Sequence, residues 1–470
     1  MSGLFATLNA SASALQAHAL AVEITGKNLA NANNAGYARQ TVNYATGATV
    51  VTEQGAQSLG LAANVTQIRD TLLDRQVLRE TSLSSYYGTL QQALQRAQAG
   101  LGQTLSSAAS TDGTSTVTTD TGIGAALDDF FNSFQALAAT PTDSGAKQAV
   151  LASANTLADR LQQADATLAQ GQTDLGTKIT SDASDANSLL HTLADLNSQI
   201  VRIEANAPGS AVDLRDQRQD ALEKLAALMP VSVTDAGGGA IQVSANGSSG
   251  AVVLVDHGTV NGTVAFTGTQ ITAGSPATAL TLTGGSMQGA LAARDGALQT
   301  LRDQFDALAS QLVSSVNAVY NPSGSTGDFF TAGGTTAATI SVSSGLTAVN
   351  LHAGASGGAA GDNSVALALG RLATTKFTAS GSNPIDGTLG AFFSSSIAQF
   401  GQAIAGANSN VSNQSAIETL VRGQRDSVSG VNLDEETANL LKYQRAFEAS
   451  SRVLQTVDEM LDQIINQLGR

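Results

Sequence analysis

The residues that could perform chemistry are scattered along this sequence rather than gathered into a recognisable pattern. The four histidines are His18, His191, His257 and His352, and each stands apart from the others and from acidic clusters. Zinc and calcium sites need ligands at fixed spacings, such as HExxH, paired cysteines or an EF-hand loop. The chain has none of these spacings and no cysteine. We therefore expect no bound metal.

Motifs for nucleophilic catalysis and phosphate binding have little support in the sequence. The residue types of a Ser/His/Asp triad occur, but the GxSxG match at 354–358 lies in a Gly-rich stretch and not between a predicted strand and a helix, where such a turn presents a serine as nucleophile. The glycines at 237–239 lack the GxGxxG and P-loop patterns, which favours turns. Asp128–Asp129 and Asp434–Glu436 stand at predicted helix starts, where carboxylates cap free amides. We expect no catalytic residue, no cofactor and no enzymatic activity.

The C-terminal end of the chain carries its most regular apolar pattern. Apolar residues recur at intervals of seven, and a second set lies three residues after each of the first four. The positions are Leu440, Tyr443, Phe447, Ser450, Leu454, Val457, Leu461, Ile464 and Leu468. A heptad seam of this kind predicts a helix that packs against a partner helix. Asn432 is predicted to cap this helix, with Glu435 completing a capping box.

A thinner seam of the same spacing occupies the N-terminal end. Its members are Phe5, Leu8, Leu15, Val22 and Leu29, with the small residues Ala12, Ala19 and Gly26 between them. We predict that the two terminal helices pair with each other or with other copies of the chain. One alternative is a pair of ordinary amphipathic helices packed on a globular domain. A membrane-surface helix is disfavoured because neither polar face is rich in Lys or Arg.

Length and charge restrict the class of protein. The 470 residues predict two to four domains. The net charge of −15 argues against nucleic-acid binding, which needs a basic surface. No run approaches the roughly eighteen apolar residues of a membrane span. The N-terminus also lacks the basic and apolar regions of a cleaved signal peptide, so we expect any export to leave the first residues in place.

Turn residues and prolines mark the ends of the predicted helices. The six prolines lie between Pro141 and Pro384, which leaves both ends of the chain free for long helices. A turn is predicted directly after the first helix because asparagine and glycine tolerate left-handed backbone conformations. The residues of this turn motif are Asn31, Asn33, Gly36 and Tyr37.

Helical and alternating patterns divide the interior. One helix is predicted to begin near Ser144 and continue for about 60 residues, roughly 90 Å. Residues 231–285 alternate apolar and polar side chains, which predicts a small antiparallel β unit. We expect extended or irregular chain at 41–66, a loop at 106–121 and a strand pair at 339–351.

These patterns predict a mainly α protein with an inserted β domain, built as an elongated, nested, multidomain rod. Its termini pair as an α-helical coiled coil, followed inward by a long helical bundle and a small antiparallel β insert. We expect a terminal helical domain at 1–45 plus 428–470 and a long-helix bundle at 46–230 plus 286–320 plus 366–427. The β-rich insert occupies 231–285, and 321–365 forms a Gly-rich loop or a reduced outer excursion.

Two stretches of the chain resemble a known family. Residues 28–40 read NLANANNAGYARQ, and residues 429–456 read SGVNLDEETANLLKYQRAFEASSRVLQT. Both are similar to the terminal signatures of flagellar rod, hook and hook-associated axial proteins. The second stretch looks most like the form found in hook–filament junction members. Asp328–Phe330, which follows a Gly-rich turn, is a weaker internal similarity.

The resemblance implies a structural, non-catalytic component of the bacterial flagellum. Members of the family are exported unfolded through the flagellar type III apparatus, and their terminal helices form an inner coiled tube. The resemblance to junction members implies an adaptor that joins hook to filament. The implied partners are other copies of the chain, hook protein, the second junction protein and through it the filament, and an export chaperone. The implied location is secreted, at the hook–filament junction.

Other functions stay open at this point. The chain is also compatible with a flagellar hook or rod protein, which share the terminal signatures. A secreted adhesin-type binding protein is a further alternative, with the Thr-, Gly- and Asn-rich surface of 231–285 as its binding element. A secreted enzyme has no motif in its favour.

Overall fold

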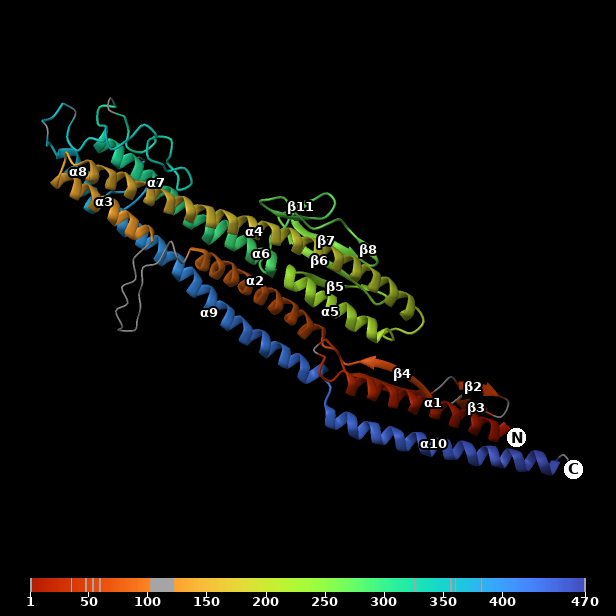
Figure 1. Ribbon diagram of the computed structural model, residues 1–470. Coiled ribbons are helices and arrows are strands. Elements are labelled where there is room, and N and C mark those ends of the chain that lie inside the picture. The colour runs from red at the N-terminus through yellow and green to blue at the C-terminus, as the bar shows by residue number, and fades with distance from the viewer. Residues whose placement is uncertain are drawn as a thin grey trace. The chain divides into compact units, whose positions relative to one another are not determined.

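The protein is mainly α-helical and carries small antiparallel sheets, as the sequence predicts (Figure 1). This computed structural model describes residues 2–34, 36–46, 49–52, 55–58, 61–101, 122–324, 327–355, 357–359, 361–381 and 383–468. The loop expected at 106–121 lies outside these residues. The chain divides into two compact units: unit 1 comprises Met1–Ser85, Asp182–Gly285 and Asn413–Arg470, and unit 2 comprises Tyr86–Ser181 and Ser286–Ser412.

The terminal helices lie together in unit 1. Helix α1 (Ser2–Ala30) packs along α10 (Leu433–Leu468), and Figure 1 shows the N- and C-termini at the same end of this antiparallel pair. Residues 41–66, expected to be extended or irregular, form two hairpins within their described part. Strand β1 (Gln40–Thr46) pairs with β4 (Leu61–Gln67), and β2 (Thr49–Thr52) pairs with β3 (Gly55–Ser58). The β1–β4 hairpin packs on α1.

The β insert of unit 1 follows α5 (Val212–Leu228). One sheet has the order β5–β6–β7–β8 and a smaller one the order β11–β10–β9, all antiparallel. The strands are β5 (Ser232–Gly237), β6 (Ala240–Gly247), β7 (Gly250–Asp256), β8 (Thr259–Val260), β9 (Ala265–Phe266), β10 (Ile271–Ala273) and β11 (Thr278–Ala279). Asn197 attaches the sheet to the preceding long helix, donating to the carbonyls of Ile241 at 2.8 Å and His257 at 2.7 Å.

Long helices form most of unit 2. The predicted long helix is α4 (Ser144–Glu204), which runs for 61 residues without interruption, and the unit boundary falls within it. The other helices that lie wholly or partly in the unit are α2 (Thr71–Leu101), α3 (Ile123–Ala139), α6 (Gly285–Ala292), α7 (Gln299–Tyr320), α8 (Ser364–Arg371) and α9 (Leu389–Ser429). A π-helical turn at Ala293–Leu298 joins α6 to α7.

An aromatic cluster forms the core of unit 2 near α3. Its members are Phe130, Phe131, Phe134, Tyr320, Phe329 and Phe330, each at most 2% exposed. Neighbouring rings meet at centroid distances such as 4.9 Å for Phe329 and Phe330, within the range of favourable aromatic pairs. The strand pair expected at 339–351 is wrong for the described residues, where Val342 forms only an isolated bridge with Phe330. Turns take up much of 343–351 because side-chain and backbone bonds around Asn350 close them locally.

Candidate assembly surface and terminal junction

The α10 seam faces α1 and is incompletely covered. Val457 is 3% exposed, whereas Phe447 is 37% exposed. The other seam side chains that are described, Leu440, Tyr443, Ser450, Leu454, Leu461 and Ile464, are half-buried. In a coiled coil a heptad knob inserts into a hole formed by four residues of the facing helix, and α1 does not enclose these side chains in that way. The seam is therefore a surface that one partner helix leaves partly open.

The buried face of α1 is displaced from the predicted N-terminal seam. Leu8, Ala12, Leu15, Val22 and Leu29 are half-buried, while Ala19 and Gly26 are exposed. The buried positions are instead Ser11, Ala17, Ala21, Ile24, Thr25 and Asn28. Ala21 and Val22 are one residue apart, a rotation of about 100° on a helix. The displacement arises because α1 packs against the β1–β4 hairpin as well as α10. Phe5 and Leu468 lie in α1 and α10, but their side chains are outside the described set.

Helix α10 begins at a side-chain cap. The Asn432 Oδ1 atom accepts hydrogen bonds from the backbone N–H groups of Asp434 at 3.0 Å and Glu435 at 3.3 Å. Glu435 was predicted to complete a capping box, and its carboxylate instead accepts from Arg39 Nη1 at 2.8 Å. The first turn of α10 is thereby attached to the connection that follows α1.

Asn28 is the centre of a buried polar cluster at the end of α1. Its Nδ2 donates to the Gln40 carbonyl at 2.8 Å and to Glu436 Oε2 at 2.9 Å. Its Oδ1 accepts from the Tyr37 hydroxyl at 2.8 Å and from the Gln40 N–H at 3.0 Å. An asparagine amide offers two donors and two lone pairs, so every hydrogen-bonding position of this 1%-exposed residue is used.

Glu436 and Arg39 complete this cluster, which we call the terminal junction: Asn28, Tyr37, Arg39, Gln40 and Glu436. The Glu436 side chain is 3% exposed, and its Oε1 receives Arg39 Nε at 2.8 Å and Nη2 at 2.7 Å. The Arg39 backbone N–H also donates to the Ser429 carbonyl at 2.8 Å, at the end of α9. The junction thus joins the end of α1 to the start of α10 and the end of α9.

A second set of charges supports the junction from α5. Gln40 Nε2 donates to Asp213 at 2.8 Å, and Arg69 Nη2 contacts Asp216 at 2.6 Å. Burial raises the pKa of the Asp216 carboxyl although Arg69 lowers it. Burial, followed by the charges of Asp216 and other carboxylates, also raises the pKa of the Tyr37 hydroxyl. Tyr37 therefore stays protonated and donates to Asn28.

The remaining turn-motif residues lie around the junction. Asn31 donates its side-chain amide to the Lys27 carbonyl at 3.0 Å, which closes the last turn of α1. The Gly36 N–H faces Asn34 Oδ1 at 3.4 Å, and Asn33 is exposed. These residues shape the connection that brings Tyr37 back to Asn28.

Sequence reasoning did not single out Asn28, Arg39 or Glu436. The acidic run at 434–436 was interpreted as a helix cap, yet Glu436 forms a buried ion pair. A signal was available, because Asn28 is a polar residue at helical spacing from Ala21 and Ile24 on the buried face of α1. A polar residue on an apolar face needs a buried partner.

The described part of the chain contains neither a cluster of metal ligands nor a membrane-spanning helix. No group of three or more His, Cys, Asp or Glu side chains there is arranged to hold a metal ion. No described helix combines the length and apolar character that crossing a membrane requires.

Comparisons with known proteins match both the ends and the interior. The model of the flagellar hook-associated protein FlgK helical domain matches residues 108–330, and that of the flagellar basal body rod FlgEFG protein C-terminal region matches residues 423–468. Flagellar hook-associated protein 1 of Bacillus subtilis (strain 168) is 26% identical over 525 residues, covering 100% of this chain and 99% of its own length.

Two further similarities cover parts of the chain. Flagellar hook-associated protein 1 of Escherichia coli (strain K12) is 35% identical over 74 residues, which are 16% of this chain and 14% of that protein. The structure of the flagellar hook junction protein FlgK from Burkholderia pseudomallei has a TM-score of 0.44 and 25% identity, covering 52% of this chain and 43% of that one. With end-to-end similarity and family matches in the helical interior and at the C-terminus, the chain belongs to the flagellar hook-associated protein 1 family, a family of structural components of the flagellum.

Proposed function

We propose that this protein is the non-catalytic adaptor that joins the flagellar hook to the filament. It assembles through the α1–α10 pair with other copies of the chain. Hook protein lies on one side of the assembly and the second junction protein, followed by the filament, on the other. Export through the flagellar type III apparatus with an uncleaved N-terminus, aided by a chaperone, delivers it to the junction outside the cell.

The observation that carries this proposal is the incomplete burial of the α10 seam. Leu454 and Leu461 remain half-buried and Phe447 is 37% exposed although α1 already packs against the helix. Apolar seam side chains that one partner helix leaves partly exposed become buried when helices of neighbouring subunits pack against them. The end-to-end similarity to a hook-associated protein 1 supports assembly in a flagellar axial structure.

A polar substitution in the seam tests this proposal. We expect Leu454→Asp to abolish incorporation at the hook tip and to remove motility, because a carboxylate would be desolvated between packed helices. The measurement is immunolabelling of isolated hook–basal bodies together with swimming assays. Far-UV circular dichroism of the purified variant should show the helical content of the rest of the chain retained.

The matched control is Gln455→Asp, which introduces the same charge at the adjacent exposed position. We expect this variant to assemble and swim normally. Normal motility of Leu454→Asp, or equal loss of motility in both variants, would contradict assembly through the seam.

Immunolabelling also distinguishes a junction protein from a hook or rod protein. A hook or rod protein would be labelled along a length of the isolated hook–basal body, whereas a junction protein would be labelled as a narrow band.

A further inference from the structure

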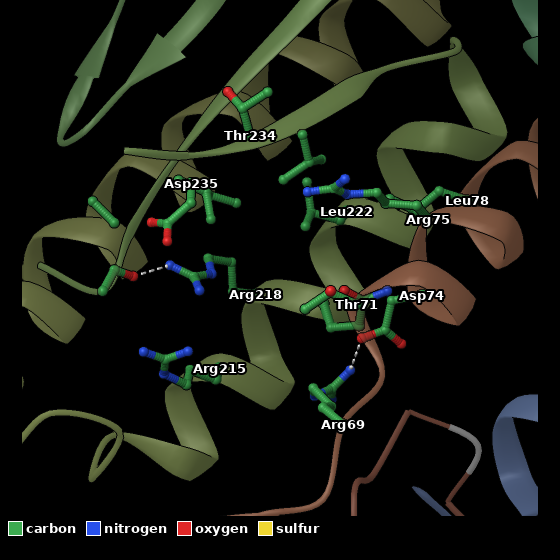
Figure 2. Close-up of a pocket in the computed structure, with 15 residues that line it drawn as sticks. Arg69, Thr71, Asp74, Arg75, Leu78, Arg215, Arg218, Leu222, Thr234 and Asp235 are labelled. Atoms are coloured by element: carbon green, nitrogen blue, oxygen red, sulfur yellow. Dashed lines mark hydrogen bonds and ion pairs between the residues drawn. The ribbon is translucent and has the colours of Figure 1, made fainter. Parts of the chain in front are cut away.

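A cavity of about 250 Å³ lies in unit 1 between α2, α5 and strand β5 (Figure 2). Strand β5 is the edge of its sheet, so one wall is a strand with a single neighbour. The polar residues that line it are Arg69, Thr71, Asp74, Arg75, Arg215, Arg218, Gln219, Thr234 and Asp235. Four arginines around one cavity are unexpected in a chain of net charge −15.

Arg218 is the least exposed of these arginines. The residue is 7% exposed, and its Nη1 donates to Asn197 Oδ1 at 2.9 Å and to the Gly239 carbonyl at 2.7 Å. Both acceptors are neutral, and within the described part of the chain no carboxylate forms an ion pair with Arg218. Burial, and then the charge of Arg215, lower the pKa of Arg218 to about 10. The guanidinium therefore remains charged at neutral pH without a direct counter-ion.

The other charges around the cavity nearly balance. Arg69 pairs with Asp74 at 3.2 Å and with Asp216 at 2.6 Å. Arg215 pairs with Glu204 at 2.6 Å. The lining residues without an ion pair among the described residues are Arg75, Arg218 and Asp235. These three unpaired lining groups are two cations and one carboxylate, and the second carboxylate on Arg69 brings the charges of the whole group to zero.

The chemistry of the lining selects a singly charged planar anion. A guanidinium presents parallel N–H donors that match the two oxygens of a carboxylate. The Thr71 and Thr234 hydroxyls add neutral donors, and Leu78 and Leu222 provide apolar surface for a methylene stem. In Figure 2 the Arg218 side chain lies between those of Arg215 and Asp235. A doubly charged phosphate would bring more negative charge than the unpaired lining groups Arg75, Arg218 and Asp235 together oppose.

We propose that this cavity is a carboxylate-binding site, with Arg218 and Arg75 as the groups that neutralise the bound anion. The carboxylate is carried either by an acidic side chain of another flagellar subunit or by a small free acid. A second cavity of about 500 Å³ continues along β5 and shares Arg75, Leu78, Val233 and Thr234 with the first, which gives a polypeptide room to approach. The proposed carboxylate-binding site does not rest on the proposal that the protein acts at the hook–filament junction.

The first test measures binding of a free carboxylate to the purified full-length chain. Sodium acetate should raise the thermal midpoint of unfolding by about 2–4 °C over sodium chloride at equal ionic strength, and the rise should saturate, because a ligand of the native state stabilises it by mass action. Arg218→Gln and Arg75→Gln should each remove most of this rise. Sodium phosphate should produce a smaller rise than acetate.

Two variants sharpen the test. Lys224→Gln removes one positive charge from an exposed position of α5 and should keep the full acetate response. Asp235→Asn should bind acetate several-fold more tightly and should gain a response to phosphate, because it removes one negative charge from the cavity. Arg75 is exposed and forms no ion pair among the described residues, so its variant reports on binding if Arg218→Gln fails to fold.

Three results would overturn the proposal: equal midpoints in acetate and chloride, an unchanged acetate response in Arg75→Gln, or a larger response to phosphate than to acetate in the unmodified protein.

A further experiment distinguishes the two possible sources of the carboxylate, a neighbouring subunit and a small free acid. If a neighbouring subunit supplies the carboxylate, assembled structures containing Arg75→Gln should release the protein faster on heating. If a free acid is the ligand, assembly should be unchanged while the acetate response is lost.

Discussion

The residues of the terminal junction determine how the two terminal helices are joined. Asn28 uses all four of its hydrogen-bonding positions, and Glu436 is buried against Arg39. Buried polar groups that lack a partner are costly. The cluster therefore favours one arrangement of α1, its connection and α10 over others.

At the residue scale we predict that Glu436→Gln destabilises the start of α10 by about 3 kcal/mol, because it leaves Arg39 without its buried counter-ion. Glu435→Gln is the matched control. Its side chain is 57% exposed, so the Arg39–Glu435 pair should contribute less than about 1 kcal/mol. Hydrogen exchange of the first turns of α10 measures the effect, and equal exchange in the two variants would contradict the role of the junction.

At the scale of elements, the connection between α9 and α10 depends on a single glycine. Gly430 follows the last residue of α9, and its N–H donates to the Asp426 carbonyl at 2.8 Å. A Cβ atom at Gly430 would collide with that same backbone carbonyl oxygen. The chain therefore leaves α9 along a path that a larger residue would block.

We predict that Gly430→Ala lowers the thermal midpoint of the free chain, because the backbone of α9 must move to admit the methyl group. Gly423→Ala, in the interior of the same helix, should raise the free energy of unfolding by about 0.5–1 kcal/mol, since alanine favours helix and a Cβ there meets open space. Thermal melts followed by circular dichroism distinguish the two. A midpoint for Gly430→Ala at or above that of the unmodified chain would refute this reading of the connection.

At the scale of the whole molecule, the stability of unit 1 depends on pH through Glu204. This carboxylate ends α4 and is 3% exposed, and it receives Arg215 Nε at 2.7 Å and Nη2 at 2.6 Å. Burial alone would raise its pKa, but the bonds from Arg215, Gly209 and Ala211 outweigh burial and lower the pKa below 4.5. A lowered carboxyl pKa contributes stability above the unfolded pKa, and that contribution is lost as pH falls through the folded pKa.

We therefore expect Glu204→Gln to destabilise α5 strongly at pH 7 and progressively less below about pH 4.5. Hydrogen exchange of α5 amides between pH 7 and pH 3.5, corrected for intrinsic exchange rates, measures the difference between the two proteins. The exposed pair Lys224–Asp220 supplies the control, since Asp220→Asn should have little effect at any of these pH values. A pH-independent effect of Glu204→Gln would show that the lost contribution is not ionic.

The sequence by itself predicted the mainly α fold with its β insert, a helix of about 60 residues that corresponds to α4, and the long C-terminal helix α10. These features follow from local periodicity: apolar residues every seven positions specify one helix face, and alternation specifies strands. Family resemblance at the two ends also came from the sequence. Each is a property of residues close together along the chain, so it can be identified without knowing what packs against it.

Only the tertiary structure determined which face of α1 is buried and which partners the buried polar residues bind. The β1–β4 hairpin packs against part of the α1 surface. The buried face of α1 therefore contains Ala21 and Ile24 instead of the predicted Val22. Glu436 accepts a hydrogen bond from Asn28, which is 408 positions away in the sequence. Arg218 of α5 donates to the carbonyl of Gly239, which lies beyond strand β5. Partners this distant are chosen by the packing of whole elements, and no local pattern records them.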